Sequence, residues 1–352
     1  MGRRRQENND TTTTTMDGGG GDGGGDGDMM GNACYVYPFT PDKIQPLVNN
    51  PDVIYNRGIY MNGSMTMDDG RSVTIWGFTD GGGGGMGGDG GGGMGGGAFP
   101  SPAMRVRQGQ VVQTRLNVPM MMYHTIHHHG IEPDFRSDGV GHLSGDVNGN
   151  YTYQWRPMHA GTYFYHCHTN TVLHAEMGMY GALIVDPPEG PGRAFEGGPS
   201  YDVEAIWAVD EIDSSWHNLP WEAGTCGGDV GLNDLNPDYF IITGVDGAQS
   251  ALTDPGVAVT MSRGDRLLVR YICAGYMPQQ IRFGGLDAEV VASDGRPLPQ
   301  SFTTDKLDAV SAERYDCIIQ PSSRGTYTVE IDILHWITGA VLGTARTRIT
   351  VT

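Results

Sequence analysis

Residues 161–168 read Gly161-Thr162-Tyr163-Phe164-Tyr165-His166-Cys167-His168, a β-rich run that ends in a cysteine between two histidines. Three more segments, 72–78, 104–107 and 182–185, have the alternation or the composition of short strands. No long segment of the sequence shows a helical period. Short strands separated by Gly and Pro turns predict an all-β chain built of antiparallel sandwiches rather than of a parallel sheet.

The start of this run recurs later in the chain. Gly161-Thr162-Tyr163 returns as Gly325-Thr326-Tyr327, and the pattern of residues 107–115 returns over residues 263–270. Two copies of one β-sandwich are the economical interpretation. The boundary falls in the Pro- and Gly-rich segment 186–192, because these residues end a strand, so we predict domains over 34–188 and 189–352.

Two low-complexity tracts interrupt this pattern. Residues 1–33 are Thr, Asp and Gly repeats that cannot bury enough apolar surface to fold, and we expect a disordered tail. Residues 81–97 hold 14 Gly in 17 residues, which predicts a flexible loop inserted between strands of the first domain.

The charge of the chain excludes some partners. Its 352 residues carry Lys+Arg 22 against Asp+Glu 41, a net charge of −19. This balance repels phosphate backbones and anionic membrane surfaces, so we expect no nucleic-acid partner. No stretch approaches the roughly 20 continuous apolar residues of a membrane span. Arg3-Arg4-Arg5 resembles a charged leader, but no hydrophobic export region follows.

The histidines are concentrated in one part of the chain. Nine of the 11 lie between residues 124 and 174. On a strand, alternate residues share a face, so His127 and His129 point one way and His128 the other. His166 and His168 likewise share a face, with Cys167 on the opposite one. This crowding predicts metal binding.

The geometry divides the ligands between two metal sites. Cys167, with His124, His174 and Met179, supplies the His₂Cys set with a weak axial Met that forms a blue copper site. On the other side, two His-x-His pairs offer four neutral imidazoles, from His127, His129, His166 and His168. Since Cys167 lies between two of these histidines, an electron can reach the second metal through one residue of backbone.

These residues resemble those of the cupredoxin-type multicopper oxidases and the related two-domain copper nitrite reductases. The family pattern His-x-x-His-x-His-Gly is similar to residues 124–130, and the pattern His-Cys-His, then His-x4-Met, is similar to residues 166–179. Roughly residues 55 to 350 fit the architecture. The resemblance implies two Greek-key cupredoxin-like β-sandwich domains with copper as the cofactor.

The sequence departs from the family pattern in two places. Five residues, 169–173, separate His168 from the next ligand where the family usually has three, so Met177 is an alternative to Met179 as the axial ligand. The second domain lacks the imidazoles of a trinuclear copper cluster. Arg282 and Gly284 stand at one pair of ligand positions, and 330–332 read Glu-Ile-Asp at the other.

His335 is the one histidine near these positions of the second domain. The segment His335 to Gly343 resembles the part of copper nitrite reductases whose His completes a type 2 copper across a trimer interface. That resemblance implies a homotrimer in which His335 joins His129 and His166 of a neighbouring subunit. A structural His is the alternative. The Asp and His that those reductases use beside the metal are replaced by His127 and Arg282.

The leading hypothesis is a copper oxidoreductase. A small electron donor or a redox protein reduces the blue copper, and electrons pass through Cys167 to the second site, where O₂ or nitrite is reduced. His127, Asp138 and water supply protons. The alternative is a non-enzymatic blue-copper electron carrier. The ligands missing from the second domain favour the carrier, and the four histidines of the second site disfavour it.

The cysteine count bears on the location of the protein. If Cys167 is reserved for the metal, four cysteines remain, which allow three pairings that the sequence does not rank. These are Cys34, Cys226, Cys273 and Cys317. Blue copper and disulfides suit an oxidising compartment, so we expect a periplasmic or extracellular protein.

Overall fold

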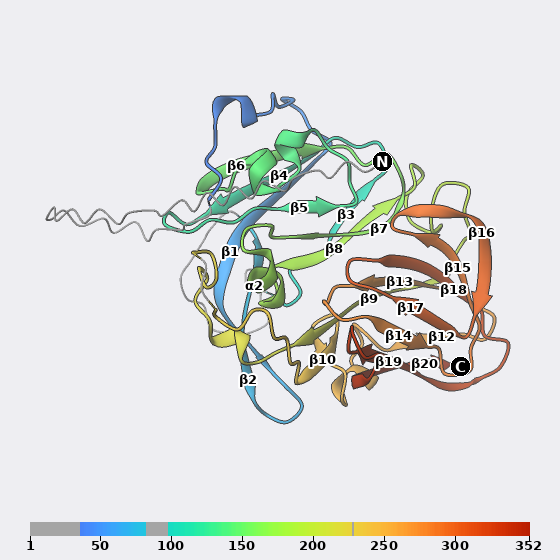
Figure 1. The fold of residues 1–352 in the computed structure, drawn as a ribbon. Helices are drawn as coiled ribbons and strands as arrows, with labels where there is room; N and C mark the ends of the chain where they lie inside the picture. The colour runs from blue at the N-terminus through green and yellow to red at the C-terminus, as the bar shows by residue number, and fades with distance from the viewer. Residues whose placement is uncertain (1–35, 82–97, 227–228) are drawn as a thin grey trace, which may run out of the picture. The chain divides into compact units, whose positions relative to one another are not determined.

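The computed structural model describes residues 36–81, 98–226 and 229–352, and it consists mostly of strands (Figure 1). The first half contains β1 (Val53–Thr66), β2 (Ser72–Asp80), β3 (Met104–Arg107), β4 (Val112–Val118), β5 (His127–His129), β6 (Gly149–Trp155), β7 (Gly161–His166) and β8 (Tyr180–Asp186). The second half contains β9 (Val203–Ile212), β10 (Tyr239–Ile242), β11 (Val245–Asp246), β12 (Val259–Met261), β13 (Leu267–Cys273), β14 (Gln279–Arg282), β15 (Ala288–Ser293), β16 (Arg296–Thr304), β17 (Lys306–Ala309), β18 (Arg314–Ile319), β19 (Gly325–Leu334) and β20 (Val341–Val351).

The helices are short. The α-helices are α1 (Gly141–Ser144) and α2 (Thr171–Glu176), and 3-10 turns cover Pro41–Lys43, Phe135–Ser137, Trp216–Asn218 and Ser250–Leu252. Among the described residues, no helix has the length and apolar character needed to cross a membrane. The predicted tail 1–33 lies outside the described residues, as does the predicted loop 81–97 apart from its first residue.

Within the described residues the strands form four sheets, and each sheet takes its strands from one half of the chain. The first half gives the orders β2-β1-β4-β6 and β3-β8-β7-β5. The second half gives β11-β10-β9-β13-β18-β15-β16 and β12-β20-β19-β14-β17. Two pairs of sheets confirm the prediction of an all-β chain with two β-sandwiches. The boundary predicted between residues 188 and 189 falls between β8 and β9.

The sequence repeat corresponds to a repeat in strand pairing. β4 pairs in parallel with β1 and antiparallel with β6, as β13 pairs in parallel with β9 and antiparallel with β18. β7 lies between β5 and β8, as β19 lies between β14 and β20. The two halves are therefore two copies of one topology.

Each sheet also contains a parallel pair, which the prediction of antiparallel sandwiches did not include. These pairs are β1–β4, β3–β8, β9–β13 and β12–β20. In each pair other strands intervene along the chain, and this supplies the long crossover that parallel neighbours need.

Strand β7 is buried along its whole length because both of its faces are covered. Tyr165, and Cys167 just beyond the strand, belong to the core of the first sandwich. Phe164 packs on the opposite side with Ala208 of the second half. Since alternate residues share a face, His166 lies on the side of Phe164. Adjacent residues of one strand end thus face different surroundings.

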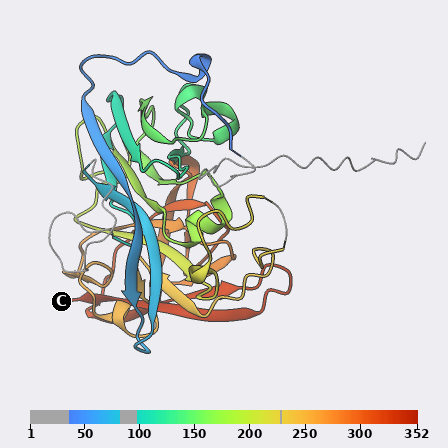
Figure 2. The same ribbon diagram turned by 90° about the vertical axis from the view of Figure 1, so that its left-hand side faces the viewer.

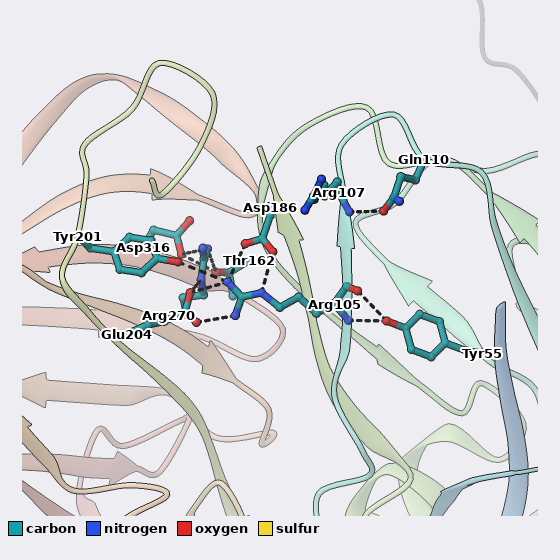
Figure 3. A network of polar contacts seen from close by, with 10 residues as sticks. All are labelled: Tyr55, Arg105, Arg107, Gln110, Thr162, Asp186, Tyr201, Glu204, Arg270 and Asp316. Atoms are coloured by element: carbon teal, nitrogen blue, oxygen red, sulfur yellow. Dashed lines mark hydrogen bonds and ion pairs between the residues drawn. The ribbon is translucent and has the colours of Figure 1, made fainter. Parts of the chain in front are cut away.

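A polar network joins the two halves around Arg105 and Arg270 (Figure 3). Glu204 accepts from both guanidinium groups, at 2.6 Å from Nη1 of Arg105 and 2.7 Å from Nε of Arg270. Arg105 also pairs with Asp186 at 2.7 Å, and Arg270 with Asp316 at 3.4 Å. Arg270 is fully buried, so its carboxylate partners offset the cost of removing its charge from water. The network fixes β3 and β8 against β9, β13 and β18.

The tip of the β1–β2 hairpin makes a second contact between the halves. Figure 2 shows this hairpin in blue as it runs down the molecule towards the second half. Met67 and Val73 pack there with Ile241 of β10. The Asp68 carboxylate accepts the backbone N–H of Ser250 at 3.0 Å.

Candidate metal centres

The three histidines of β5 divide between two faces. β5 pairs antiparallel with β7 so that His127 lies opposite His166. His128 is fully buried, and its Nε2 lies 3.0 Å from the Thr114 hydroxyl. Burial lowers the pKa of His128 well below its usual value, so the ring is neutral. His128 is a core residue, and His127 and His129 face away from it.

Cys167, His124 and His174 form the first candidate centre, and all three are fully buried. The sulfur of Cys167, which is free, lies 3.6 Å from Nδ1 of His124 and 3.4 Å from Nδ1 of His174. Sulfur and nitrogen ligands bound to one ion at about 2.0–2.3 Å lie about 3.3–3.5 Å apart at a tetrahedral angle. The spacing is that of three ligands of one metal ion.

The imidazole of His174 is held in the metal-binding form, and both imidazoles of this centre are neutral. Nε2 of His174 donates to the carbonyl oxygen of Trp221 at 2.9 Å, and a neutral imidazole carries only one proton, so Nδ1 has a free lone pair. Burial lowers the pKa of His174 to about 4 and that of His124 well below its usual value. Both rings are neutral at pH 7 and can bind a metal.

The buried thiol of Cys167 can also bind a metal ion. Burial raises its pKa to about 12, because a thiolate in dry surroundings lacks hydration. A bound cation would offset that charge and deprotonate the thiol. One sulfur and two imidazole nitrogens in a dry site are the donor set of copper.

Met179 is predicted as the weak axial ligand, with Met177 as the alternative. Both are fully buried in the core that holds Cys167. Cys167 donates its N–H to the carbonyl of Met179 at 2.9 Å, and Met179 donates its N–H to the carbonyl of His174 at 3.0 Å. Met177 instead accepts the N–H of Trp76 at 2.7 Å. The backbone contacts tie Met179 to Cys167 and His174, and its role as a ligand stays a prediction.

The long segment between His168 and His174 folds around Asn170 and α2. Asn170 adopts a left-handed conformation, with φ 45°. Its side-chain amide donates to the carbonyls of Trp221 and Ala223 at 3.0 and 2.9 Å. The segment that carries His174 is thus held by residues from beyond the predicted domain boundary.

His127, His129 and His166 form the second candidate centre. Nδ1 of His129 lies 3.2 Å from Nε2 of His166, the separation of two nitrogens bound to one ion at about 2.0 Å. Nδ1 of His127 lies 2.7 Å from the carbonyl oxygen of Asp138, and Nδ1 of His166 lies 2.9 Å from that of Cys167. Since carbonyls only accept, both Nδ1 atoms carry the proton and both Nε2 atoms are free for a metal.

His168, the predicted fourth member, lies beside this group. Its ring centroid is 5.7 Å from that of His127 and 5.8 Å from that of His166. It is not among the residues whose ligand atoms all lie within 4.8 Å of one another. Its position suits a ligand of a further ion next to the first, and that role stays a prediction.

Asp138 lies against the second centre. Besides its carbonyl contact, its carboxylate Oδ2 is 3.7 Å from Nδ1 of His127, and the side chain is 21% exposed. The carboxylate therefore reaches both the ring and solvent, as a group that relays protons must.

The second half presents no imidazole at the corresponding described positions. Arg282 of β14 forms an ion pair with Asp332 of β19 and another, at 3.1 Å, with Glu330. Arg346 adds a contact of 3.2 Å to Glu330. These contacts lower the pKa of both carboxyls, chiefly through hydrogen bonds from Arg282. Charged groups that stabilise one another thus occupy the positions at which the first half has neutral imidazole rings.

His335 lies in the turn between β19 and β20. Its Nδ1 accepts the N–H groups of Ile337 and Thr338, both at 3.2 Å, so Nε2 carries the proton in this arrangement. It belongs to neither candidate centre of its own chain within the described residues.

Sequence reasoning missed the residues that support these centres from the second half. Trp221, which orients His174, is 47 positions away from it. Arg314 of β18 packs beside Gly130, the residue after His129. Neither belongs to a motif, so no signal in the sequence marks it.

The fold and the two centres define a cupredoxin-type copper protein, and the comparisons agree. Two family models described as multicopper oxidase match residues 94–190 and 216–350. The chain belongs to the multicopper oxidase family, whose cofactor is copper. This confirms the family and the cofactor predicted from the sequence.

Several relatives and solved structures are similar to the chain. It is 27% identical to a copper resistance protein A homolog of Pseudomonas syringae pv. tomato over 66% of this chain and 44% of that protein. It is 28% identical to the L-ascorbate oxidase of Cucumis sativus over 63% and 40%. The blue copper oxidase of Nitrosomonas europaea superposes with a TM-score of 0.65 at 25% identity, covering 85% of this chain and 86% of that one. The chain spans less than half the length of these two curated relatives.

Proposed function

We propose that this chain is a copper-dependent oxidoreductase of multicopper oxidase type, with a blue type 1 copper and a second copper site of type 2 or type 2/3 character, and that it reduces O₂. The position of Cys167 carries the proposal. Its sulfur belongs to the first centre, and its carbonyl accepts the Nδ1 proton of His166 in the second. Copper, when bound, supplies one-electron storage and Lewis-acid binding of the acceptor.

The chain supplies the ligands from both faces of one strand end. The first centre would hold copper through His124, Cys167, His174 and Met179. The second would use His127, His129, His166 and His168. The path from the Cys167 sulfur to the imidazole of His166 crosses one peptide link, so the chain provides a short covalent route between the centres.

Asp138 and His127 would serve proton delivery at the second centre. The Asp138 carbonyl fixes the ring of His127 with its proton on Nδ1. The carboxylate of the same residue, 3.7 Å from that nitrogen, faces solvent in part and can pass a proton through water to a bound acceptor.

A small electron donor or a redox protein would approach the first centre at α2. A cavity of ≈ 450 Å³ lies there, lined in part by Val172, Trp216, Tyr276 and Trp336. Val172 precedes His174 by two residues, and the carbonyl of Val172 accepts the hydroxyl hydrogen of Tyr276. The aromatic lining brings a donor close to the helix that carries His174.

Nitrite reduction is the second candidate. It is favoured by His335, which a homotrimer would bring to the second centre of a neighbouring subunit. The copper nitrite reductase of Nitrosomonas europaea shares the fold, with a TM-score of 0.62 at 17% identity. Two features argue against nitrite: His127 replaces the expected Asp, and Nε2 of His335 carries a proton. We therefore propose O₂, ahead of nitrite, as the electron acceptor.

A periplasmic or extracellular location fits this function. Cys226 is disulfide-bonded, and disulfides persist in oxidising compartments. Cys273 and Cys317 are buried and free, so neither takes part in the pairings considered above.

The test is copper loading of the whole chain, followed by copper analysis, visible absorption, electron paramagnetic resonance and O₂ consumption. We expect a blue band together with additional, non-blue copper. Cys167→Ser should abolish the blue band. His129→Ala should keep the blue band, remove non-blue copper and lower O₂ consumption by more than the roughly 10–100-fold typical of outer-shell substitutions.

His159→Ala is the matched control, because His159 is exposed and belongs to neither centre. It should change none of these properties. One blue copper per chain without turnover would refute the oxidase and support an electron carrier.

A further inference from the structure

We propose that Arg314 of the second half sets the electrostatic potential of the second centre, so that this centre favours the reduced metal ion and binds anions. The inference rests on the proposed function, since it concerns a metal held by His127, His129 and His166. The second half would then take part in the chemistry, although its described strands contribute no imidazole to the centre.

Arg314 lies directly against the strand that carries His129. It belongs to β18, and its side chain is 4% exposed. A Cβ added to Gly130 would lie 2.5 Å from Nη2 of Arg314. The absence of a side chain at Gly130, whose φ is 85°, therefore makes room for the guanidinium beside the centre.

An aromatic ring connects the charge to the ligand. The ring of Phe164 is stacked on that of His129, with centroids 4.7 Å apart and planes at 27°. Cζ of Arg314 lies 5.9 Å from the centroid of Phe164 and 5.9 Å from that of Tyr163. Because Arg314 packs on Phe164, it also acts as a positioning residue for the ring of His129.

The charge of Arg314 is only partly balanced, because Asp316, a buried carboxylate whose charge also acts on Arg314, is paired with Arg270 at 3.4 Å. Asp294 pairs with Nη1 at 2.9 Å, but the side chain of Asp294 is 47% exposed and therefore screened by water. The second acceptor of Nη1 is the neutral carbonyl of Ala312 at 2.6 Å. Nε has no partner among the described residues. A net positive potential thus remains on the side of His129.

This potential acts on a metal ion held at the second centre, and it disfavours the ion with the higher charge. Cu(II) is therefore penalised relative to Cu(I), and an anion next to the metal is stabilised.

The experiment compares Arg314→Met with Arg314→Lys in the copper-loaded chain. A unit charge about 10 Å away in surroundings of effective dielectric constant about 20 changes an equilibrium about tenfold. Arg314→Met should lower the ratio of Cu(I) to Cu(II) affinity at the non-blue copper about tenfold, a potential lower by about 59 mV. Azide affinity should fall in the same sense. Arg314→Lys should restore most of both.

Asp294→Asn gives a result of opposite sign. It removes the counter-charge and leaves Arg314 in place, and Asn tolerates the φ of 51° at this position. The potential of the non-blue copper should rise. This variant keeps the proposal testable if Arg314→Met does not fold.

Arg296→Gln is the charge control. Arg296 donates to the Tyr163 hydroxyl at 2.8 Å but is 39% exposed, and we expect less than about a twofold change. The blue band is the internal reference and should not move in any variant. An unchanged non-blue potential and azide affinity in Arg314→Met and Asp294→Asn would overturn the inference alone. Absence of non-blue copper from the unmodified chain would overturn the proposed function instead.

Discussion

The strand pairs β5–β7 and β14–β19 occupy the same place in two copies of one topology, yet they hold opposite chemistry. β7 and β19 both begin at a glycine with nearly the same conformation, φ 155° at Gly161 and 153° at Gly325. Counted from these glycines, His166 corresponds to Glu330. The cross-strand partner is His127 in the first half and Arg282 in the second.

The backbone alone does not decide where a metal binds. Neutral imidazoles can be buried together, because they carry no charge and each ring has only one donor and one acceptor nitrogen to satisfy. Charged residues in the same arrangement must pair and stay near solvent, as Arg282 does with 39% of its side chain exposed. The side chains at a few positions convert one scaffold into a metal centre or an ion-pair network.

The largest effect that separates the two halves should appear on acidification of the copper-free protein. The folded pKa values of His129 and His174, about 3 and about 4, lie below the ordinary 6.5. The unfolded chain therefore binds more protons between pH 6.5 and 4, and the stability that these rings contribute falls as the pH drops through that range. Glu330 and Asp332 have lowered pKa values, so the stability that they contribute is lost only at lower pH, below the ordinary carboxyl pKa values.

Hydrogen exchange read by mass spectrometry from pH 7 to pH 4 measures this difference. Peptides of β5 and β7 should lose protection before peptides of β14 and β19. Glu176 and Glu211 act in the opposite direction, because burial raises their pKa to about 8, so their surroundings gain stability on acidification. Added copper should keep the histidines deprotonated and move the loss to lower pH. Simultaneous loss of protection in both strand pairs, only below pH 4, would contradict the comparison.

A smaller effect is expected when the ion-pair network of the second half is broken. Arg282→Met leaves Glu330 and Asp332 side by side without their shared partner. Exposed pairs contribute about 0.2–1 kcal/mol each, so the free energy of unfolding should fall by roughly 1 kcal/mol in denaturant titration. The blue band and the copper content should not change.

Arg346→Met is the matched control for this substitution. Arg346 makes a single contact of 3.2 Å to Glu330, and its loss should cost less than that of Arg282. A change in copper content in Arg282→Met would show that the second half takes part in metal binding through this network.

The features of this molecule that could be predicted from the sequence are those that depend on local residue patterns. Alternation and the repeated Gly-Thr-Tyr were sufficient for two sandwiches, and the period of two separated Cys167 from His166 and His128 from its neighbours. The parallel strand pairs could not be predicted, because they join segments that are distant along the chain. The roles of Trp221 and Arg314 could not be predicted for the same reason, since each residue reaches the centres across the contact between the halves.

The smallest effect should come from the support that residues 221–223 give to the first centre. The amide of Asn170 donates to the carbonyls of Trp221 and Ala223, and the Trp221 carbonyl also accepts from Nε2 of His174. Asn170→Gly removes both hydrogen bonds of the side-chain amide. It keeps the left-handed backbone, which glycine adopts without strain. Net hydrogen bonds contribute about 0.5–1.5 kcal/mol each, and part of this loss is recovered by water.

We therefore expect Asn170→Gly to lower the melting temperature slightly and to shift the blue band without reducing copper content. Asn117→Ala is the control, because the Asn117 amide donates at 2.6 Å to Asn150 on an exposed sheet surface. It should leave the blue band unchanged. If the band of Asn170→Gly also stays in place, the ring of His174 is oriented by its own bond to Trp221 and by α2, and the second half supports the first centre at that one carbonyl.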